Sequence, residues 1–154
     1  MNPKLMKLAH QKDGVRCPCC NHFCKVYKRK FNTGMAYVLI RIYRKAKKTN
    51  NEWLHVGHFL RKECDLWPSD YAKIVWWGLL EKHPGEADDG NSNGLYRMTR
   101  KGSQFVKGRI TIPNYAIEYM SHVQEFKGAG IDIRHALWTK DNKFDYNELM
   151  RTAA

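Results

Sequence analysis

The stretch from residue 77 to residue 102 decides the fold. It begins Trp77-Gly78-Leu79-Leu80-Glu81, passes through a turn-rich insert at 83–94, and returns as Gly94-Leu95-Tyr96-Arg97-Met98-Thr99-Arg100-Lys101-Gly102. Gly78 predicts the end of a helix, because glycine enters the left-handed conformation of a helix end without strain. The Gly/Asp/Asn-rich insert predicts a hairpin between strands at 79–82 and 95–99. Thr99 then offers the N-cap of a short helix, 100–107.

Upstream of this stretch, the sequence predicts three helices. Asn32-Thr33-Gly34 offers a helix start, and the spacing of apolar residues predicts a helix over 33–48. A short strand at 53–56 and a short helix at 57–62 follow. Pro68-Ser69-Asp70 then predicts a helix over 69–77 with Ser69 or Asp70 as its N-cap. The buried face of the first helix is expected to consist of Met35, Val38, Leu39, Ile42 and Ala46.

This order of elements is similar to the winged helix-turn-helix of bacterial regulators, in which Leu79 and Tyr96 would pack the wing onto the helices. The chain resembles more fully a set of uncharacterised phage-encoded proteins, over roughly residues 15–150. The two resemblances together imply a winged-helix DNA-binding protein of phage type that acts in the host cytoplasm as a transcriptional regulator. The shared motifs are Cys17-Pro18-Cys19-Cys20, Asn32-Thr33-Gly34-Met35-Ala36, Trp77-Gly78-Leu79, Met98 to Gly108 and Phe144 to Met150.

The predicted fold class is α+β, with four segments along the chain. Residues 1–14 are expected to form a flexible arm, and 15–31 a cysteine-rich, zinc-knuckle-like segment that includes a strand at 25–31. Residues 32–112 are expected to form the winged helix-turn-helix. Residues 113–154 are expected to form a small α/β extension. Around and within that extension, the sequence predicts strands at 109–113 and 115–119, a turn at 128–130 and a helix at 133–138.

Composition excludes several protein classes. The chain of 154 residues is 43% hydrophobic and 12% aromatic, which is enough for a packed core. It has no apolar run of the ~20 residues that span a bilayer, and its N-terminus has no apolar segment of a signal peptide. We therefore expect a cytoplasmic protein that is not associated with a membrane.

Charge is distributed unevenly along the chain. The net charge is +12, and residues 1–51 hold 13 Lys and Arg against one acidic residue, Asp13. Residues 52–154 hold 14 of each sign. Such asymmetry indicates a surface that faces a polyanion, with DNA the expected partner, whereas the alternative is a solvated face without a partner. The predicted nucleic-acid-binding residues are Lys25, Lys28, Arg29, Lys30, Arg41, Arg44, Lys45, Lys48, Lys73 and Arg97.

The helix before the wing is poor in base-reading side chains. Lys73 is its only basic residue, and it has neither Arg nor Gln for bidentate contacts to base edges. Glu86, Asp88 and Asp89 place acidic charge in the wing. We therefore expect binding dominated by phosphate contacts and sensitive to salt. The alternative is a protein-interaction module or inhibitor that acts on a host or phage transcription or defence complex.

The cysteines near the N-terminus predict a structural zinc site. Cys17, Cys20, Cys24 and His22 lie within eight residues, and Cys17-Pro18-Cys19-Cys20 has the spacing of a zinc knuckle. Distant ligands such as His55, His58 or Cys64 remain open, because no second Cys-x-x-Cys follows. The alternatives are reduced cysteines packed without metal and a redox-reactive thiol.

The remaining aromatic and polar residues point to no catalytic chemistry. The five tryptophans are expected mostly in the core, although Trp76 and Trp77 are adjacent, so that one of them must be partly exposed. His55 and His58 share a helical face but are more typical of surface or capping residues. The sequence contains no phosphate-binding glycine loop and no nucleophile motif. We therefore expect neither an enzyme nor a small-molecule substrate.

Overall fold

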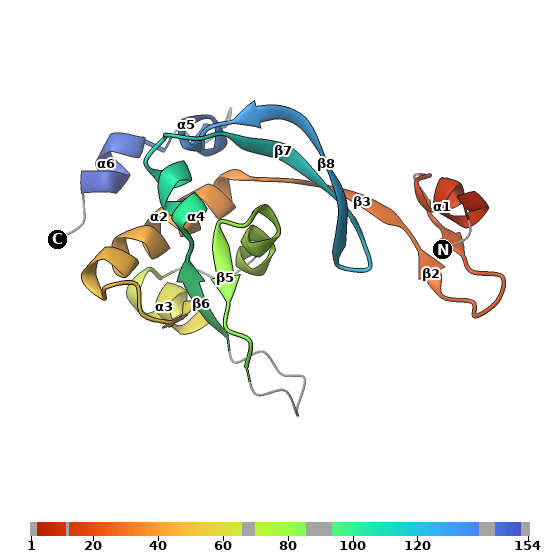
Figure 1. Cartoon of the computed structure of the whole chain (residues 1–154), viewed down its shortest axis with the longest axis horizontal. Coiled ribbons are helices and arrows are strands. Elements are labelled where there is room, and N and C mark those ends of the chain that lie inside the picture. The colour runs from red at the N-terminus through yellow and green to blue at the C-terminus, as the bar shows by residue number, and fades with distance from the viewer. Residues whose placement is uncertain (1–2, 12, 66–69, 86–93, 139–143, 152–154) are drawn as a thin grey trace. The chain divides into compact units, whose positions relative to one another are not determined.

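The computed structural model of the chain describes residues 3–11, 13–65, 70–85, 94–138 and 144–151. These residues form seven helices and antiparallel sheets, a mixed α+β structure (Figure 1). They divide into two compact units, each described by itself: residues 1–30 with 113–130, here the ribbon unit, and residues 31–112 with 131–154, here the helical unit. Among the described helices, none has the length and apolar character needed to span a membrane.

The helical unit contains α2 (Thr33–Lys48), whose bounds match the prediction. Asn32 has an extended backbone, and its side chain accepts a hydrogen bond from the Met35 N–H at 2.9 Å, which confirms the predicted start. The expected apolar face is buried except for Ala46, which is partly exposed. Ala36, Ile40, Tyr43 and Arg44 are buried as well. Other elements therefore cover most of the surface of α2, and not one stripe.

Five elements follow α2 in an order that closes a small sheet. They are β4 (Leu54–His55), α3 (Val56–Glu63), the 3-10 helix η1 (Tyr71–Trp77), β5 (Leu80–Lys82) and β6 (Leu95–Met98). The sheet order is β4-β6-β5, with Tyr96 of β6 opposite Leu54 on one side and Met98 opposite Leu80 on the other. The predicted strands and the short second helix are confirmed. The insert expected at 83–94 lies mostly outside the described residues.

Asn51 joins the end of α2 to the central strand β6. Its amide nitrogen donates to the Met98 carbonyl oxygen at 3.0 Å, and its amide oxygen accepts from the Met98 N–H at 3.2 Å. The side chain thus takes the place of a further paired residue beyond β4. Asn50 and Asn51 both have positive φ, which asparagine tolerates better than most residues.

The helix predicted at 69–77 is of another type, and Ser69, one of its two N-cap candidates, lies outside the described residues. The described part is a 3-10 helix that begins at Tyr71, and Asp70 has left-handed backbone angles with no side-chain capping bond. Its predicted end is confirmed, because Gly78 has φ of 73°. Trp77 is buried while Trp76 is partly exposed, which confirms that the pair cannot both point inward.

The core of the helical unit is centred on aromatic rings from distant parts of the sequence. Phe31 contacts Trp77 edge-on, with ring centroids 5.3 Å apart, and Phe105 in the same manner at 5.5 Å. Leu79 and Tyr96 are both buried, as predicted for residues that fix the hairpin onto the helices. Three further helices complete the unit: α4 (Arg100–Val106), α5 (Ile133–Leu137) and α6 (Tyr146–Arg151).

The packing around Gly102 explains why the stretch that decides the fold ends in a glycine. Thr99 caps α4 as predicted, accepting a hydrogen bond from the Gly102 N–H at 2.9 Å. A Cβ at residue 102 would collide with the backbone carbonyl of Leu79 and would lie 2.6 Å from the Met98 sulfur. Only glycine therefore lets α4 approach the β5 end of the hairpin this closely.

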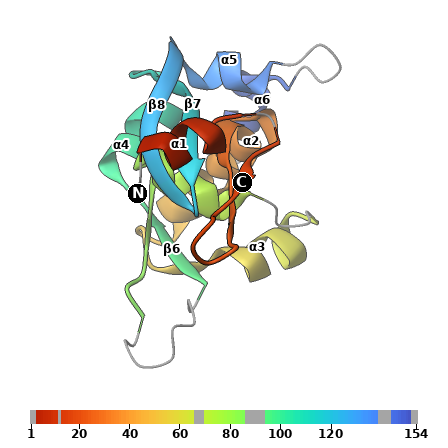
Figure 2. The same cartoon turned by 90° about the vertical axis from the view of Figure 1, so that its right-hand side faces the viewer.

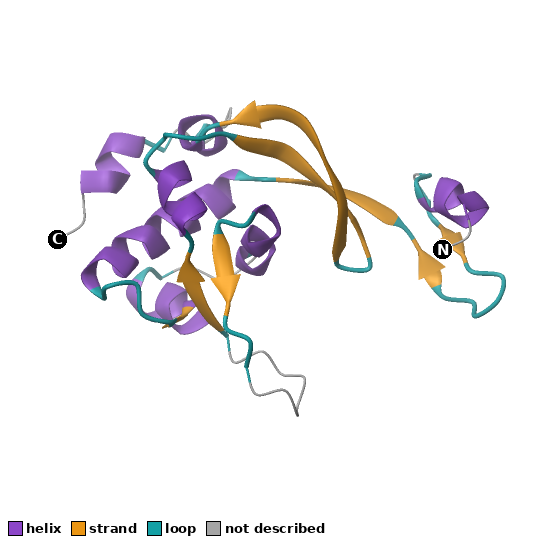
Figure 3. Ribbon diagram, in the orientation of Figure 1, coloured by secondary structure: helices purple, strands orange, loops and turns teal. Residues whose placement is uncertain are grey.

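The ribbon unit consists of α1 (Pro3–Ala9) and five strands, most of them short (Figures 2 and 3). The strands β1 (Val15–Arg16) and β2 (Phe23–Cys24) pair as a hairpin. The strands β3 (Val26–Lys30), β7 (Ile112–Tyr119) and β8 (His122–Ile131) form a sheet in that order, with Tyr27 opposite Glu118. The strands expected at 25–31 and 115–119 are confirmed, and the strand at 109–113 is wrong.

Two further predictions need correction. Residues 3–9 of the predicted arm form the helix α1. The strand expected to end at Pro113 instead begins at Ile112 and runs through the proline, which lies beyond the last pair with β3, Lys30 and Tyr115. Proline has no N–H to donate, and at residue 113 none is needed for pairing with β3.

The turn expected at 128–130 is inside β8. The chain reverses instead at Met120 and Ser121, which have φ of 49° and 63°. Gly128 has φ of 89°, and a Cβ there would lie 2.9 Å from the Tyr115 ring. The glycine therefore serves close packing of an aromatic ring on a strand, and not a reversal.

Trp138 is not a core residue, in contrast to the prediction for most of the tryptophans. Its exposed fraction is 61%, and it follows Leu137, the last buried residue of α5. The predicted helix at 133–138 is confirmed to within one residue, and Asp132 caps it by accepting from the His135 N–H at 2.8 Å.

Candidate nucleic-acid interface

The predicted basic residues of β3 alternate between the two faces of the ribbon unit's sheet. Lys28 and Lys30 are exposed, and the Lys28 Nζ lies 4.2 Å from the centre of the Tyr115 ring. On the other face, the Arg29 guanidinium lies 4.5 Å from the Tyr27 ring and bonds Glu118 at 2.8 Å. Lys25 lies 5.3 Å from the same Tyr27 ring. Both faces of the sheet thus carry cations against aromatic rings, and Glu118 neutralises Arg29 on one of them.

Three of the four predicted binding residues on α2 are buried or bonded to neighbouring side chains. Arg44 is only 9% exposed. Arg41 donates from Nε to the Cys64 sulfur at 3.4 Å, and the Lys45 ammonium bonds Glu63 at 2.9 Å. The side of α2 that carries these three residues is therefore covered in part by other elements. Of the four predicted side chains on this helix, Lys48 is the exposed one.

The predicted contacts on η1 and the hairpin have acidic neighbours. The Lys73 ammonium bonds Asp70 at 2.6 Å, and Arg97 bonds Glu81 at 2.6 Å. The Arg97 guanidinium also lies 4.3 Å from the centre of the Trp53 ring. Partly exposed pairs of this kind contribute roughly 0–1 kcal/mol, so a phosphate can replace the carboxylate at small cost.

The structure presents basic residues on α4 that the sequence analysis did not select. Between Asp89 and Glu118 the chain holds five Lys and Arg and no acidic residue. Four of the five are exposed on or beside α4: Arg100, Lys101, Lys107 and Arg109. Averaging over residues 52–154 concealed this run, and a search for acid-free windows would have found it.

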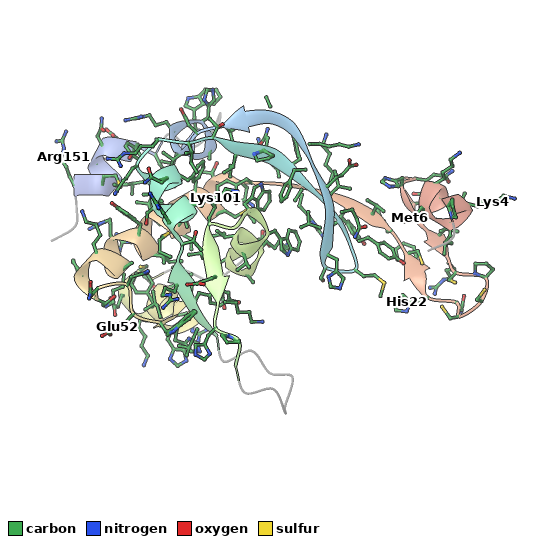
Figure 4. The ribbon with its side chains drawn as sticks, viewed as in Figure 1. Lys4, Met6, His22, Glu52, Lys101 and Arg151 are labelled. Atoms are coloured by element: carbon green, nitrogen blue, oxygen red, sulfur yellow. The ribbon has the colours of Figure 1, made fainter. Side chains whose placement is uncertain are left out.

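Lys101 lies beside the end of η1 (Figure 4 labels it on α4). A Cβ added to Gly78 would lie 3.7 Å from Lys101 Cδ and 4.0 Å from its Nζ. The two segments are held together by Thr99, whose hydroxyl donates to the Gly78 carbonyl oxygen at 2.6 Å. The start of α4 therefore adds an exposed cation next to the helix that precedes the hairpin.

The cysteine segment forms a tight turn between β1 and β2. The Cys17 N–H donates to the His22 carbonyl oxygen at 2.8 Å, and the Asn21 N–H donates to the Cys17 carbonyl oxygen at 2.8 Å. Gly14 has φ of 67°, and a Cβ there would lie 2.8 Å from the Cys24 carbonyl oxygen. Cys19, Cys20 and His22 are exposed, whereas Cys24 is buried.

Hydrogen bonds to sulfur distinguish Cys17 from its neighbours. Backbone N–H groups of Cys20 and then Cys19 lower the pKa of the Cys17 thiol, because they stabilise the thiolate. Tyr119 of β7 donates its hydroxyl to the Cys24 sulfur at 3.3 Å. That bond, followed by burial and the charges of Cys24, Cys17 and Cys20, raises the pKa of Tyr119. Of the four predicted metal ligands, Cys24 is thus the one whose sulfur bonds the Tyr119 hydroxyl.

The described residues do not bring the predicted ligands into one metal-binding set. Within those residues, no three His, Cys, Asp or Glu side chains are arranged to hold a metal ion. The distant candidates have other roles: His55 caps α3 through Nδ1, which accepts from the His58 N–H at 3.2 Å. The charge of His55 is the main cause that lowers the pKa of His58. Cys64 accepts the bond from Arg41 described above.

Comparison of the chain with protein-family models, with curated proteins and with solved structures finds no match.

Proposed function

We propose that the helical unit is a winged helix-turn-helix that binds DNA, mainly through phosphate contacts, as a transcriptional regulator of phage type. The observation that carries the proposal is the element order α2-β4-α3-η1-β5-β6 with the sheet order β4-β6-β5. In a winged helix of this order, η1 corresponds to the helix that enters the major groove. The strands β5 and β6 correspond to the wing.

The charge of the unit supports phosphate contact more than base reading. η1 is seven residues long, and its one cation, Lys73, is already paired with Asp70. Lys101 beside Gly78, with its neighbour Arg100, supplies exposed positive charge next to η1. Such contacts hold the DNA backbone and carry little sequence information. Modest sequence specificity and strong salt dependence follow.

A salt series of DNA affinity tests this proposal. Each phosphate neutralised contributes about −0.9 to the slope of log affinity against log salt, so Lys101→Gln should reduce the slope by about one. The matched control is Arg151→Gln, an equal loss of exposed charge on α6. A slope near zero for the unmodified protein would overturn the assignment, and so would an equal reduction of the slope in both variants.

A protein-interaction module is the second candidate. The ion pairs Lys73–Asp70 and Arg97–Glu81 favour it, because they neutralise the two elements that a winged helix normally presents to DNA. Trp76 on η1 is partly exposed, and tryptophan is enriched at the centres of protein interfaces. If the unit is a protein-interaction module, it should capture a host or phage protein, and Trp76→Ala should abolish that capture. Its affinity for DNA should then stay at the level of non-specific binding.

We also propose that the cysteine turn binds a structural zinc ion through Cys17, Cys20, Cys24 and His22. Hydrogen bonds from the Cys19 and Cys20 N–H groups to the Cys17 sulfur support it, because backbone donors stabilise a metal-bound thiolate in a knuckle in this way. Metal analysis of the purified protein tests the site. Fewer than ~0.2 zinc ions per chain would count against it.

A further inference from the structure

One face of the ribbon unit's sheet carries two lysines beside a tyrosine ring. The sheet has the order β3-β7-β8 (Figure 1). Side chains alternate between the two faces along a strand, and residues directly opposite each other in a strand pair share a face. Lys30 of β3 lies opposite Tyr115 of β7, and Lys28 lies two residues before Lys30. These three side chains therefore share one face, here called the lysine face.

The lysine face differs from the opposite face in its charge. On the opposite face, Arg29 is bonded to Glu118 at 2.8 Å. Glu118 is the one acidic residue of β3 and β7, and it lies opposite Tyr27, on the Arg29 face. On β8, Glu125 is paired with Lys127 at 3.3 Å. Among the described residues, the two cations of the lysine face are therefore not neutralised by an acidic side chain.

Tyr115 is placed where a ligand of this face can reach it. It lies on the central strand of the sheet and is partly exposed. Gly128 of β8 leaves room for its ring, because a Cβ there would lie 2.9 Å from the ring carbon Cδ2. The Nζ of Lys28 lies over the ring, 4.2 Å from its centre. The group over the ring is thus a long, exposed side chain that can move away.

A nucleic-acid base can replace Lys28 over this ring. A contact between an exposed cation and an aromatic ring strengthens an interaction about two- to fivefold. Stacking of a base on an aromatic side chain strengthens binding about 5- to 150-fold. The ammonium group that leaves the ring can then contact a phosphate. The exchange therefore gives both the ring and the lysine a favourable partner.

The spacing of the two lysines suits an extended nucleic-acid strand. Residues at alternate positions of a β-strand lie about 7 Å apart, so Lys28 and Lys30 can each contact a different phosphate. The bases of a duplex are stacked on one another, and their faces are closed to a protein ring. The bases of a single strand can be splayed out and stacked on aromatic side chains. The ring of Tyr115 therefore favours a single strand.

We propose that the lysine face of the ribbon unit binds single-stranded nucleic acid, with one base stacked on Tyr115 and phosphates held by Lys28 and Lys30. Such binding tolerates most sequences, because every base has a face that can stack. Single-stranded DNA and RNA share this chemistry, and the experiment includes both. The proposal goes beyond the winged-helix proposal, which assigns duplex DNA to the helical unit.

Fluorescence anisotropy of labelled oligothymidine and oligouridine, titrated with the full chain, tests the stacking contact. We expect Tyr115→Leu to weaken binding about tenfold. Tyr115→Phe should bind like the unmodified protein, because it keeps the ring. The matched control is Tyr27→Leu, which removes a tyrosine ring from the opposite face of the same sheet. The oligomer that binds more tightly identifies DNA or RNA as the preferred strand.

A salt series tests the phosphate contacts. Lys30 is exposed, so Lys30→Gln removes a charge and little of the packing. It should reduce the slope of log affinity against log salt by about 0.7, the contribution of one phosphate of a single strand. The matched control is Lys107→Gln, an equal loss of exposed charge at the end of α4, which should leave the slope unchanged. This slope decides the proposal even where Tyr115→Leu disturbs the sheet.

Duplex affinity separates this proposal from the winged-helix proposal. Tyr115→Leu should leave the affinity for duplex DNA unchanged, and Lys101→Gln should leave the affinity for both single strands unchanged. The proposal is overturned by an absence of binding to either oligomer, or by equal weakening in Tyr115→Leu and Tyr27→Leu. An unchanged salt slope in Lys30→Gln would overturn it as well. Hydrogen exchange of the β7 amides reports whether the sheet of each variant is folded.

Discussion

The helical unit and the ribbon unit are stabilised in different ways. In the helical unit, large apolar side chains such as Phe31, Trp77 and Phe105 are fully buried against one another. In the described part of the ribbon unit, the buried residues are Ala9, Cys24, Ala116, Ile117 and Glu118. The ribbon unit is stabilised more by strand pairing, positive-φ glycines and contacts between cations and aromatic rings. Substitutions should therefore act through packing in one unit and through local polar contacts in the other.

The largest effect is expected from Gly102→Ala. The new methyl group would meet the Leu79 backbone carbonyl, which cannot move without shifting β5. We expect the free energy of unfolding of the helical unit to fall by about 3 kcal/mol, as for severe overpacking. Chemical denaturation followed by tryptophan fluorescence measures this, since Trp77 lies in this core.

Gly34→Ala is the matched control for this substitution. Gly34 also lies in the first turn of a helix, but its Cβ would meet only the Asn32 side-chain oxygen, at 3.3 Å. Alanine gains up to about 1 kcal/mol over glycine in a helix, so this variant should be neutral or slightly stabilised. Equal destabilisation of the two variants would show that the contact between α4 and the hairpin is not what requires Gly102.

A smaller effect is expected from Asn51→Ala. It removes both hydrogen bonds to the Met98 backbone, while Asn50→Ala removes an asparagine of the same positive φ without them. The difference in unfolding free energy between the two variants should be about 2 kcal/mol, in favour of Asn50→Ala. If urea denaturation gives the same midpoint for both, the side chain of Asn51 does not extend the β4 edge of the sheet.

The sequence predicted the features that depend on local signals and missed those that depend on contacts between distant residues. Apolar spacing and caps placed α2 at its observed bounds and the hairpin strands within a residue or two, because burial and capping are local signals. The turn near Gly128 was misplaced, since nothing local shows that a glycine serves the ring of Tyr115. Arg41, Arg44 and Lys45 were predicted to bind nucleic acid because the sequence of one helix does not show which neighbours cover it. The basic residues of α4 lie in an acid-free run of the sequence, but the net charge of zero over residues 52–154 does not show it.

Metal removal should affect the ribbon unit and leave the helical unit unchanged. If the cysteine turn holds zinc, a chelator should increase hydrogen exchange of the amides from Cys17 to Cys24, because the metal supplies folding free energy to this turn. Exchange in α2 and β6 serves as the internal control. Cys20→Ser should reproduce the effect without chelator. Equal acceleration in both units, or no acceleration at the turn, would contradict a structural zinc confined to this segment.

The smallest effect is expected from Tyr119→Phe in the ribbon unit. It removes the hydroxyl that donates to the Cys24 sulfur at 3.3 Å and keeps the ring. Sulfur is a weak acceptor, so we expect a loss below about 1 kcal/mol, seen as faster hydrogen exchange in β2 and β7. Tyr115→Phe is the control, because the ring of Tyr115, and not its hydroxyl, contacts Lys28 and Gly128. A loss as large as that of Asn51→Ala would mean that the ribbon unit, like the helical unit, depends on single well-placed polar groups. If only Tyr119→Phe speeds exchange, and only in the neighbouring strands, the ribbon unit is stabilised by many weak local contacts.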